Sequence, residues 1–349
     1  MSSFKTEIRK VVDLVLAGAE NVLGSAEGLS EIHAVDKIPG DASTRKYYRV
    51  TGRDRKYILM VMETFSEQGD NIPFIVVQKH LHQSGVDVPH ILDMDPGRGM
   101  ILLEDLGDVV LLRRLQEVCS PDVERHLYER VIDSLVQLQV HASPAKHPAN
   151  LEAYKLKFDR DKLMWEINFT IEHFYKTHLK REFGPGDLET IQEGFSEICT
   201  FLAEQPTVLA HRDFHSRNIM ITDDDRLVMI DFQDARMGPA TYDLASLLKD
   251  SYYQLEEMQI SRLLDYYLAR YEGISGQKLD RSEFIYLFDM MSLQRNFKAI
   301  GSFASFLNRR GNATYLKFIG NTFENIRRTL LKYPRYSELR EVLFHYYYF

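Results

Sequence analysis

Cysteine, tryptophan and long apolar runs are scarce in this sequence of 349 residues. Its two cysteines, Cys119 and Cys199, are too few for a disulfide framework, and both lie beside apolar helical stretches, so we expect reduced core residues. No run of about 18 apolar residues is present, so no membrane span is predicted. Residues 1–10 lack the apolar segment of a signal peptide, and we expect a cytoplasmic protein.

An excess of basic residues is also missing, because the formal net charge is −8 at pH 7. A general nucleic-acid binder would show a basic patch or stripe, so we expect neither a nucleic-acid partner nor a membrane partner. The length exceeds the usual size of one domain, which favours two lobes. No internal repeat is present, and we expect a monomer.

The most informative stretch is residues 211–218, which read His-Arg-Asp-Phe-His-Ser-Arg-Asn. It holds an aspartate, Asp213, and an asparagine, Asn218, and a second aspartate, Asp231, follows the next apolar strand. This order is typical of a phosphotransferase catalytic loop. There the first aspartate accepts or orients the proton of a substrate hydroxyl, while the other two side chains hold magnesium on the nucleotide phosphates.

The residues around this loop support the interpretation. Residues 208–210 are an apolar strand that leads into it, and residues 219–222 and 227–230 are two short strands on either side of a polar turn. Such a hairpin carries Asn218 in and Asp231 out, so the three polar side chains can converge on one point.

A zinc site is the alternative interpretation of the same stretch. His211 and His215 are four residues apart, which suits metal binding on a helix. The flanking residues predict strand and loop instead, and no third ligand has a motif spacing. A merely polar loop would not need an aspartate, an asparagine and a second aspartate at these intervals. The kinase-like interpretation is therefore favoured.

The order of predicted elements agrees with a kinase-like fold. Four strands and two helices come first, and most of the remaining chain shows apolar residues at helical spacing. The predicted strands are 32–38, 46–51, 57–62 and 100–104. The predicted helices are 4–17, 73–84, 122–141 and 187–203, with several more in 241–271 and 282–331. We expect an α+β, two-lobed protein-kinase-like fold with a nucleotide-binding lobe (residues 1–103), a hinge (104–108) and a helical C-terminal lobe (109–349).

The nucleotide would contact a turn and the hinge. The turn between the first two strands is rich in small residues, and its backbone N–H groups could approach phosphates, although a plain hairpin turn would look similar. We expect Gly40, Ser43, Thr44 and Arg45 to contact ATP there. Backbone groups near Glu104 and Leu106 would meet the adenine edge.

One expected pair of residues is missing. Protein kinases anchor the phosphates with a lysine on the third strand that pairs with a glutamate on the next helix. Residues 57–62 contain no lysine, and residues 73–84 contain no acidic residue. Because both partners are absent, another group must be the anchor, and the candidates are Arg45, Lys46, Lys56 or a nest of backbone amides.

With these residues in place, the chain resembles the aminoglycoside-phosphotransferase-like kinases. It is most similar to the bacterial anomeric kinases of cell-wall amino sugars, which phosphorylate N-acetylmuramate and N-acetylglucosamine at C1. The stretches that carry the resemblance are 40–49, 102–107, 211–218, 231–235, 238–250 and 293–301.

The resemblance implies roles for particular residues. It makes Asp213 the catalytic aspartate, Asn218 and Asp231 the magnesium ligands, and ATP with Mg²⁺ the cofactors. It also makes Asp243 a buried acid that braces the catalytic loop. Asn296 departs from the pattern, because a histidine is expected at this position.

The acceptor is less determined than the reaction. N-acetylmuramate carries a carboxylate that requires a cation, and Arg295, Lys298, Arg309 and Arg310 are candidates. A cationic aminoglycoside or choline would require an acidic cleft, for which Glu166, Glu172 and Asp250 are available. Arg295 and Lys298, with Glu166, are the predicted substrate-binding residues. Homoserine as acceptor, and a nucleotide-binding pseudokinase that acts as a regulator, stay open as alternatives.

Overall fold

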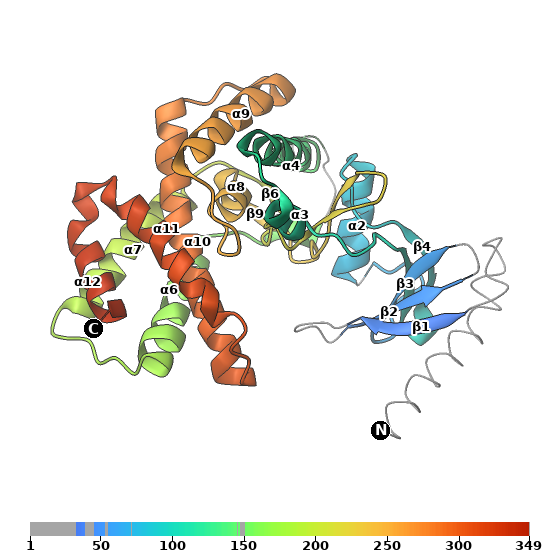
Figure 1. The fold of residues 1–349 in the computed structure, drawn as a ribbon, viewed down its shortest axis with the longest axis horizontal. Helices are drawn as coiled ribbons and strands as arrows, with labels where there is room; N and C mark the ends of the chain where they lie inside the picture. Colours follow the sequence, from blue (N-terminus) through green and yellow to red (C-terminus); the bar gives the residue numbers. More distant parts are fainter. Residues whose placement is uncertain are drawn as a thin grey trace.

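The computed structural model describes residues 33–38, 45–52, 55–70, 72–144, 146 and 151–348. The predicted helix 4–17 and the predicted phosphate-contacting residues Gly40, Ser43 and Thr44 lie outside the described residues. The described chain has an N-terminal sheet region and a larger helical region, which lie side by side in Figure 1. This arrangement confirms the predicted α+β class with a β-rich N-terminal part.

The sheet region contains one antiparallel sheet of five strands in the order β1-β2-β3-β5-β4. Alternating side chains give it two apolar faces. One face gathers Tyr48, Val50, Leu59, Met100 and Leu102. The other adds Met60, Ile101 and Leu103 to the main core. The strands are β1 (Ala34–Ile38), β2 (Lys46–Thr51), β3 (Lys56–Val61), β4 (Ile91–Asp95) and β5 (Met100–Glu104).

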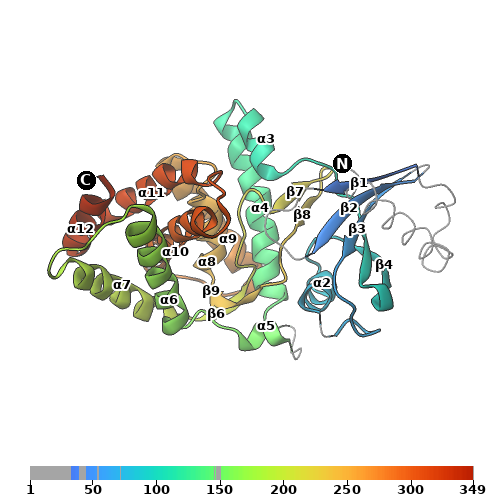
Figure 2. The same ribbon diagram turned by 90° about the horizontal axis from the view of Figure 1, so that it is seen from below.

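Helix α2 (Pro73–Gln83) packs beside this sheet, as Figure 2 shows. Pro73 occupies its first turn, where a missing N–H costs nothing, and Gly85 follows its end with a φ of +74°. Its apolar face buries Phe74, Ile75 and Leu81. The helix therefore joins the sheet to the rest of the molecule.

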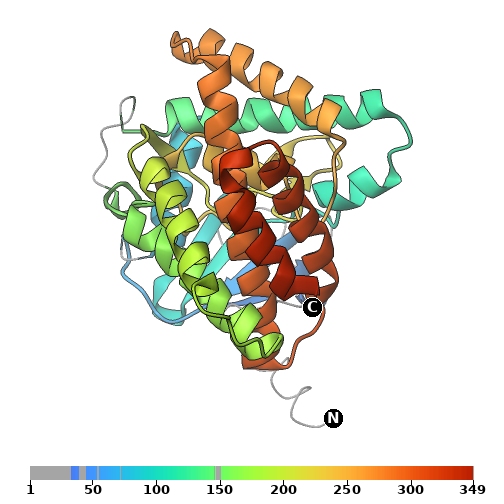
Figure 3. The same ribbon diagram turned by 90° about the vertical axis from the view of Figure 1, so that its left-hand side faces the viewer.

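Helix α10 (Arg281–Arg310) is the centre of the helical region, and Figure 3 shows the other helices around it. It packs against α6, α8 and α11, and its middle turns are buried. The remaining helices are α3 (Leu111–Glu117), α4 (Pro121–His141), α5 (Glu152–Lys155), α6 (Arg160–Thr170), α7 (Asp187–Ala203), α8 (Thr241–Leu248), α9 (Glu257–Ser275), α11 (Ile319–Leu331) and α12 (Ser337–Tyr348). A π-helix, η2 (Ile171–His178), directly continues α6.

Helices α6 and α10 approach closely at Gly301. The hydroxyl of Thr170 donates a hydrogen bond to the carbonyl of Phe297 at 2.9 Å. A Cβ placed on Gly301 would lie 2.6 Å from the Cα of Thr170, which is closer than such atoms can pack. A glycine at this position therefore permits the crossing that orients α10.

Two small antiparallel sheets of two strands each position the polar loops. Strand β6 (Thr207–Ala210) pairs with β9 (Arg236–Pro239), and β7 (Ile219–Ile221) pairs with β8 (Leu227–Met229) in a hairpin. The loop 211–218 leaves β6 and enters β7, so the first sheet fixes one end of it and the hairpin fixes the other. The sequence predicted β6, β7 and β8, but it did not predict β9, which directly precedes α8.

One further expectation needs correction, and one strand was not predicted. Cys119 lies exposed between α3 and α4, whereas Cys199 is buried as predicted. Residue 119 follows the end of α3 and precedes Pro121, so it belongs to a surface connection rather than to a helix face. Strand β4 was not predicted, since its sequence contains two aspartates in five residues. Across the described residues, every helix is too short or too polar to cross a membrane.

Candidate active site

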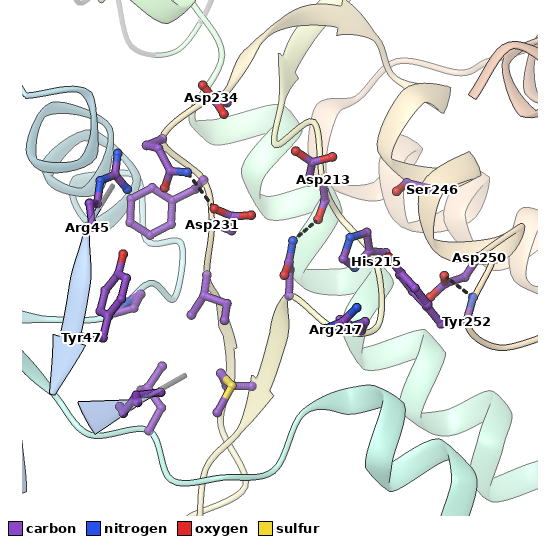
Figure 4. Close-up of a pocket in the computed structure, with 18 of the residues that line it drawn as sticks. Arg45, Tyr47, Asp213, His215, Arg217, Asp231, Asp234, Ser246, Asp250 and Tyr252 are labelled. Atoms are coloured by element: carbon purple, nitrogen blue, oxygen red, sulfur yellow. Dashed lines mark hydrogen bonds between the residues drawn. The ribbon is translucent and has the colours of Figure 1, made fainter. Parts of the chain in front are cut away.

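A cavity of about 1310 Å³ lies between the sheet region and the helical region. Strand and helix residues from the sheet region line one side, the two polar loops line the middle, and helical residues line the other side. Figure 4 shows this order, with Arg45 and Tyr47 on one side, Asp213 and Asp231 between, and Arg217 and Tyr252 beyond. The lining includes Ile38, Arg45, Tyr47, Arg49, Phe74, Leu103, Asp213, His215, Arg217, Asn218, Asp231, Asp250, Tyr252, Arg295, Asn296, Lys298, Phe303, Phe306 and Tyr315.

The three predicted catalytic residues meet in this cavity. The side-chain amide of Asn218 donates to the backbone carbonyl of Asp213 at 2.9 Å. The backbone N–H of Ile230, which precedes Asp231, donates to the carbonyl of Asn218 at 3.0 Å. The hairpin of β7 and β8 therefore brings Asp231 beside Asn218, as the sequence predicted.

Asp243 at the start of α8 braces the N-terminal end of loop 211–218. Its carboxylate accepts the backbone N–H of His211 at 2.6 Å and that of Arg212 at 3.0 Å. Arg212 has a φ of +84°, a left-handed conformation that is uncommon for a residue with a side chain. Burial raises the pKa of Asp243 despite these two donors. The bracing position implied by the resemblance is confirmed.

Asp250 braces the other end of the same loop. One of its oxygens accepts both the N–H and the hydroxyl of Ser216, at 3.1 and 2.6 Å, and the other accepts the N–H of Tyr252 at 2.9 Å. Asp250 is almost fully buried. Its oxygens are therefore engaged by the protein, which weakens the idea that Asp250 recognises a cationic acceptor.

Cations surround Asp213. The Nζ of Lys298 on α10 lies 3.8 Å from one carboxylate oxygen of Asp213. Arg212 immediately precedes Asp213 in the chain and is paired with Asp234 at 2.7 Å. Burial alone would raise the pKa of Asp213, but Lys298 and Arg212 outweigh burial and hold that pKa well below its usual range. The same burial lowers the pKa of His215 to about 3, so its ring is neutral near pH 7.

Asn218 and Asp231 suit magnesium better than zinc. Magnesium typically takes one or two carboxylates together with waters and substrate phosphates. Asp231 is exposed to the cavity at a φ of +67°, and Gln233 donates to one of its oxygens at 2.7 Å, which leaves further lone pairs for a cation. No cluster of three His, Cys, Asp or Glu side chains exists among the described residues, so the zinc alternative gains no support there.

The nucleotide side presents Arg45 to the cavity. Its guanidinium lies 5.7 Å from the ring centroid of Phe74, which in turn stacks on Phe232 at 5.1 Å. Lys46 and Lys56, the other candidate anchors, are exposed and do not line the cavity. Arg45 is therefore the candidate side chain that faces the site.

The connecting segment, residues 104–108 between β5 and α3, also lines the cavity. Glu104 accepts the N–H of His90 at 2.9 Å and pairs with Arg226 at 2.9 Å, so its side chain points away from a ligand role. Leu106 packs with Met220 and Val228 and forms an apolar surface at the cavity. Both predicted hinge residues therefore border the site.

The predicted substrate-binding residues divide into two groups. Arg295 and Lys298 line the cavity, and Arg295 is held by the hydroxyls of Tyr242, at 3.3 Å, and Ser246. Glu166 does not line the cavity, because it is buried between Lys162, at 3.3 Å, and Gln294, at 3.0 Å. Glu166 lies on the buried face of α6, and the sequence did not indicate that its side chain points into the core.

Asn296, where the resemblance implies a histidine, lines the cavity too. Its amide donates to the carbonyl of Ser292 at 2.9 Å, and Asn325 donates to its oxygen at 3.4 Å. Arg309 and Arg310 end α10 before Gly311 and do not line the cavity.

Neither Arg217 nor the aromatic wall beside it was among the predicted site residues. The guanidinium of Arg217 lies 5.0 Å from the ring of Tyr252 and 5.4 Å from the ring of Tyr315. Phe303 and Phe306 extend this wall along the cavity. The one available signal was the position of Arg217 between two motif residues, but the motif does not tell which way its side chain points.

The sequence profile of the phosphotransferase enzyme family matches residues 34–279. This chain belongs to that phosphotransferase family. The N-acetylmuramate/N-acetylglucosamine kinase of Pseudomonas aeruginosa is 33% identical to it over 91% of this chain and 90% of the relative. The kinase of the same name from Neisseria meningitidis serogroup B is 31% identical over 87% of each chain.

A solved structure supports the fold. The choline/ethanolamine kinase family protein of Mesorhizobium loti superposes with a TM-score of 0.57 over 91% of this chain and 94% of that chain, at 13% identity. At so low an identity the likeness concerns the fold alone. The predicted kinase-like fold and the resemblance to aminoglycoside-phosphotransferase-like kinases are both confirmed.

Proposed function

We propose that this phosphotransferase uses ATP to phosphorylate the anomeric hydroxyl of an amino sugar, N-acetylmuramate or N-acetylglucosamine. The observation that carries the proposal is the meeting of Asp213, Asn218 and Asp231 in a single cavity lined by both regions of the chain. The relatives named as kinases of these two sugars, aligned over about nine tenths of each chain, supply the substrate class.

Asp213 would hold the acceptor hydroxyl by a hydrogen bond and take its proton during transfer. In that step the sugar oxygen bonds to the γ-phosphorus, the bond from phosphorus to the bridging oxygen breaks, and ADP leaves with the electron pair. Asp243 and Asp250 brace loop 211–218 and keep the carboxylate of Asp213 in position. The loop therefore does not have to reorganise during the reaction.

Asn218 and Asp231 would hold Mg²⁺, which supplies positive charge to the phosphate oxygens when it is bound. Arg45 would contact the phosphates from the sheet region, because Lys56, the one lysine of β3, does not line the cavity. The backbone of residues 104–106 would meet the adenine edge beside Leu106.

The aromatic wall suits a sugar ring or a quaternary amine, but Arg217 on that wall disfavours a cationic acceptor. Tyr252, Phe303, Phe306 and Tyr315 offer flat apolar surface for a sugar ring, and Arg217 adds a guanidinium fork that suits a carboxylate. A cationic acceptor would need a free carboxylate, but Asp250 is engaged by the loop and Glu166 lies outside the cavity. A pseudokinase is disfavoured because Asp213, Asn218 and Asp231 are all present.

We also propose residues 104–108 as the hinge between an N-terminal lobe, 1–103, and a C-terminal lobe, 109–349. Two arginines contact this segment. Arg49 of β2 pairs with Asp105 at 2.6 Å and with Asp108 at 2.8 Å. Arg226, between β7 and β8, pairs with Glu104 at 2.9 Å.

The test is a screen of ATP consumption over amino sugars, aminoglycosides, choline and homoserine, followed by phosphorus NMR of the product. A sugar 1-phosphate supports the proposal, and the coupling of phosphorus to the anomeric proton identifies the position. ATP binding without turnover on any acceptor would favour the regulatory alternative. Turnover on choline or an aminoglycoside alone would replace the acceptor and keep the reaction type.

A further inference from the structure

Lys298 stands apart from the other cations of the cavity. It lies on α10, one turn after Arg295, and its side chain is 17% exposed. Its Nζ is 3.8 Å from the nearer carboxylate oxygen of Asp213. Within the described residues, no other carboxylate lies within ion-pair distance of this amine.

The neighbouring cations are engaged by the protein. Arg49 pairs with the connecting segment, and Arg295 donates to Tyr242 and Ser246. Lys249 pairs with Glu257 at 2.5 Å. An ion pair at 3.8 Å is longer than a charge-assisted hydrogen bond of about 2.7–2.9 Å, so Lys298 keeps donors for a third group between it and Asp213.

The catalytic loop itself does not provide this charge. Arg212, which precedes Asp213, is paired with Asp234 at 2.7 Å. Among the described residues, the cation that pairs with the carboxylate of Asp213 is Lys298.

We propose that Lys298 is a catalytic residue that donates a hydrogen bond to the transferring phosphoryl group, and that it does not select the acceptor by its carboxylate. This inference rests on the phosphotransfer to a sugar proposed above. The acceptor hydroxyl sits on Asp213, so the phosphorus it attacks must come within a few ångströms of the same carboxylate. An amine 3.8 Å from that carboxylate then reaches the oxygens of the phosphoryl group.

Lys298 would donate to the phosphoryl oxygens while Asp213 takes the hydroxyl proton. The sugar oxygen bonds to phosphorus, the bond to the ADP oxygen breaks, and the hydroxyl proton ends on Asp213, so charge and atoms balance.

The test compares Lys298→Met with Lys298→Arg on two acceptors, neutral N-acetylglucosamine and anionic N-acetylmuramate. Lys298→Met should lower kcat for both sugars by the same factor, about 10²–10³, the range seen when one preorganised donor is removed. The KM for each sugar should stay within about threefold, since the acceptor is held by other groups. Lys298→Arg, which keeps the charge, should recover part of the lost kcat.

A loss confined to N-acetylmuramate, or a rise in its KM alone, would overturn the proposal and make Lys298 the carboxylate ligand. Near-normal kcat on both sugars in Lys298→Met would also overturn it. Lys278→Met is the matched control, because Lys278 is exposed in the connection before α10 and does not line the cavity. Thermal unfolding and ATP binding of each variant report folding independently of turnover.

Failure of the proposed function is a separate result. If the wild-type chain phosphorylates neither sugar but another alcohol, the acceptor is wrong and the Lys298 variants are measured on that alcohol. An unchanged kcat there would defeat the role of Lys298 without reference to the sugar.

Discussion

The ring of Phe74 stacks on the ring of Phe232, with centroids 5.1 Å apart and planes inclined by 26°. Phe74 lies in the first turn of α2 in the sheet region, whereas Phe232 directly follows the magnesium candidate Asp231. The guanidinium of Arg45 lies 5.7 Å from the centroid of the Phe74 ring. One aromatic pair thus links the predicted phosphate contact Arg45 to the predicted magnesium ligand Asp231.

Replacing Phe74 with leucine should separate these groups. The substitution keeps an apolar side chain but removes the ring pair, so the free energy of unfolding should fall by about 0.5–1.5 kcal/mol. The KM for ATP should rise several-fold as Asp231 and Arg45 lose their common support. Phe201→Leu is the control, since Phe201 pairs with Tyr286 at 5.1 Å away from the cavity. Equal effects of both variants on KM would rule out a special role for Phe74.

Arg45→Met tests the phosphate anchor. Losing a hydrogen bond to a charged group costs about 1.5–3 kcal/mol, so ATP binding should weaken by roughly 10- to 150-fold. Lys46→Met, one residue along but outside the cavity lining, should bind ATP like the wild type. Isothermal titration with ATP and Mg²⁺ measures both. A stronger effect of Lys46→Met would move the anchor to that residue.

Asp213→Asn tests the catalytic aspartate. The amide keeps the shape of the side chain but cannot take a proton, so turnover should fall by about 10²–10⁴-fold while ATP binding stays nearly intact. Asp223→Asn, in the exposed turn between β7 and β8, is the matched control for the chemical change. Near-normal turnover of Asp213→Asn would remove Asp213 from the mechanism.

The pH dependence should report the pair of Asp213 and Lys298. Because Lys298 and Arg212 outweigh burial, the pKa of Asp213 is well below its usual range. Asp213 therefore stays ionised, and its protonation gives no acid limb in kcat/KM between about pH 5 and 8. The stability that this ionised group adds is present above its unfolded pKa of about 3.9 and is lost only as pH falls further.

Lys298→Met removes one of the charges that oppose burial, so the pKa of Asp213 should rise. An acid limb should then appear at higher pH than in the wild type. The measurement is kcat/KM against pH for both proteins on N-acetylglucosamine, which does not itself titrate in this range. Superimposable acid limbs would mean that Lys298 does not act on the charge of Asp213.

Gly301→Ala should destabilise the fold even though alanine favours helices. In an open helix position this change stabilises a protein by about 0.4–1 kcal/mol, but here the new Cβ would meet the backbone of Thr170 at 2.6 Å. We expect a loss of about 1–3 kcal/mol from overpacking. Gly273→Ala on α9, with no atom within 4 Å of the new Cβ, should be neutral or stabilising. Denaturant unfolding of the two variants gives the comparison.

The elements with a strong local pattern were predictable. Strand β5 and helix α7 have the bounds that the sequence indicated, because each is an apolar pattern closed by polar residues at both ends. The catalytic loop was predictable for the same reason, since Asp213, Asn218 and Asp231 are joined by one hairpin. Strand β4 was not, because it depends on its pairing with β5 rather than on its own residues.

The remaining site residues come from distant parts of the chain, and their side-chain directions decide their roles. Lys298 and Glu166 were both predicted to touch the acceptor. The packing of α6 on α10 places Lys298 beside Asp213 and turns Glu166 towards Lys162 and Gln294. The angle at which two helices cross is not encoded in a local sequence pattern. The sequence therefore could not tell that Lys298 faces the cavity and Glu166 faces the core.

The ion pairs of Arg49 and Arg226 give the connecting segment a mechanical character. Arg49 belongs to the sheet region and Arg226 to the helical region, yet each binds residues of 104–108. Ion pairs thus hold the segment to both regions. A wide rotation of either region would first have to break the ion pair of Arg49 or that of Arg226. We therefore expect any opening of the cavity to occur between discrete positions, because the rotation would have to break one of these ion pairs.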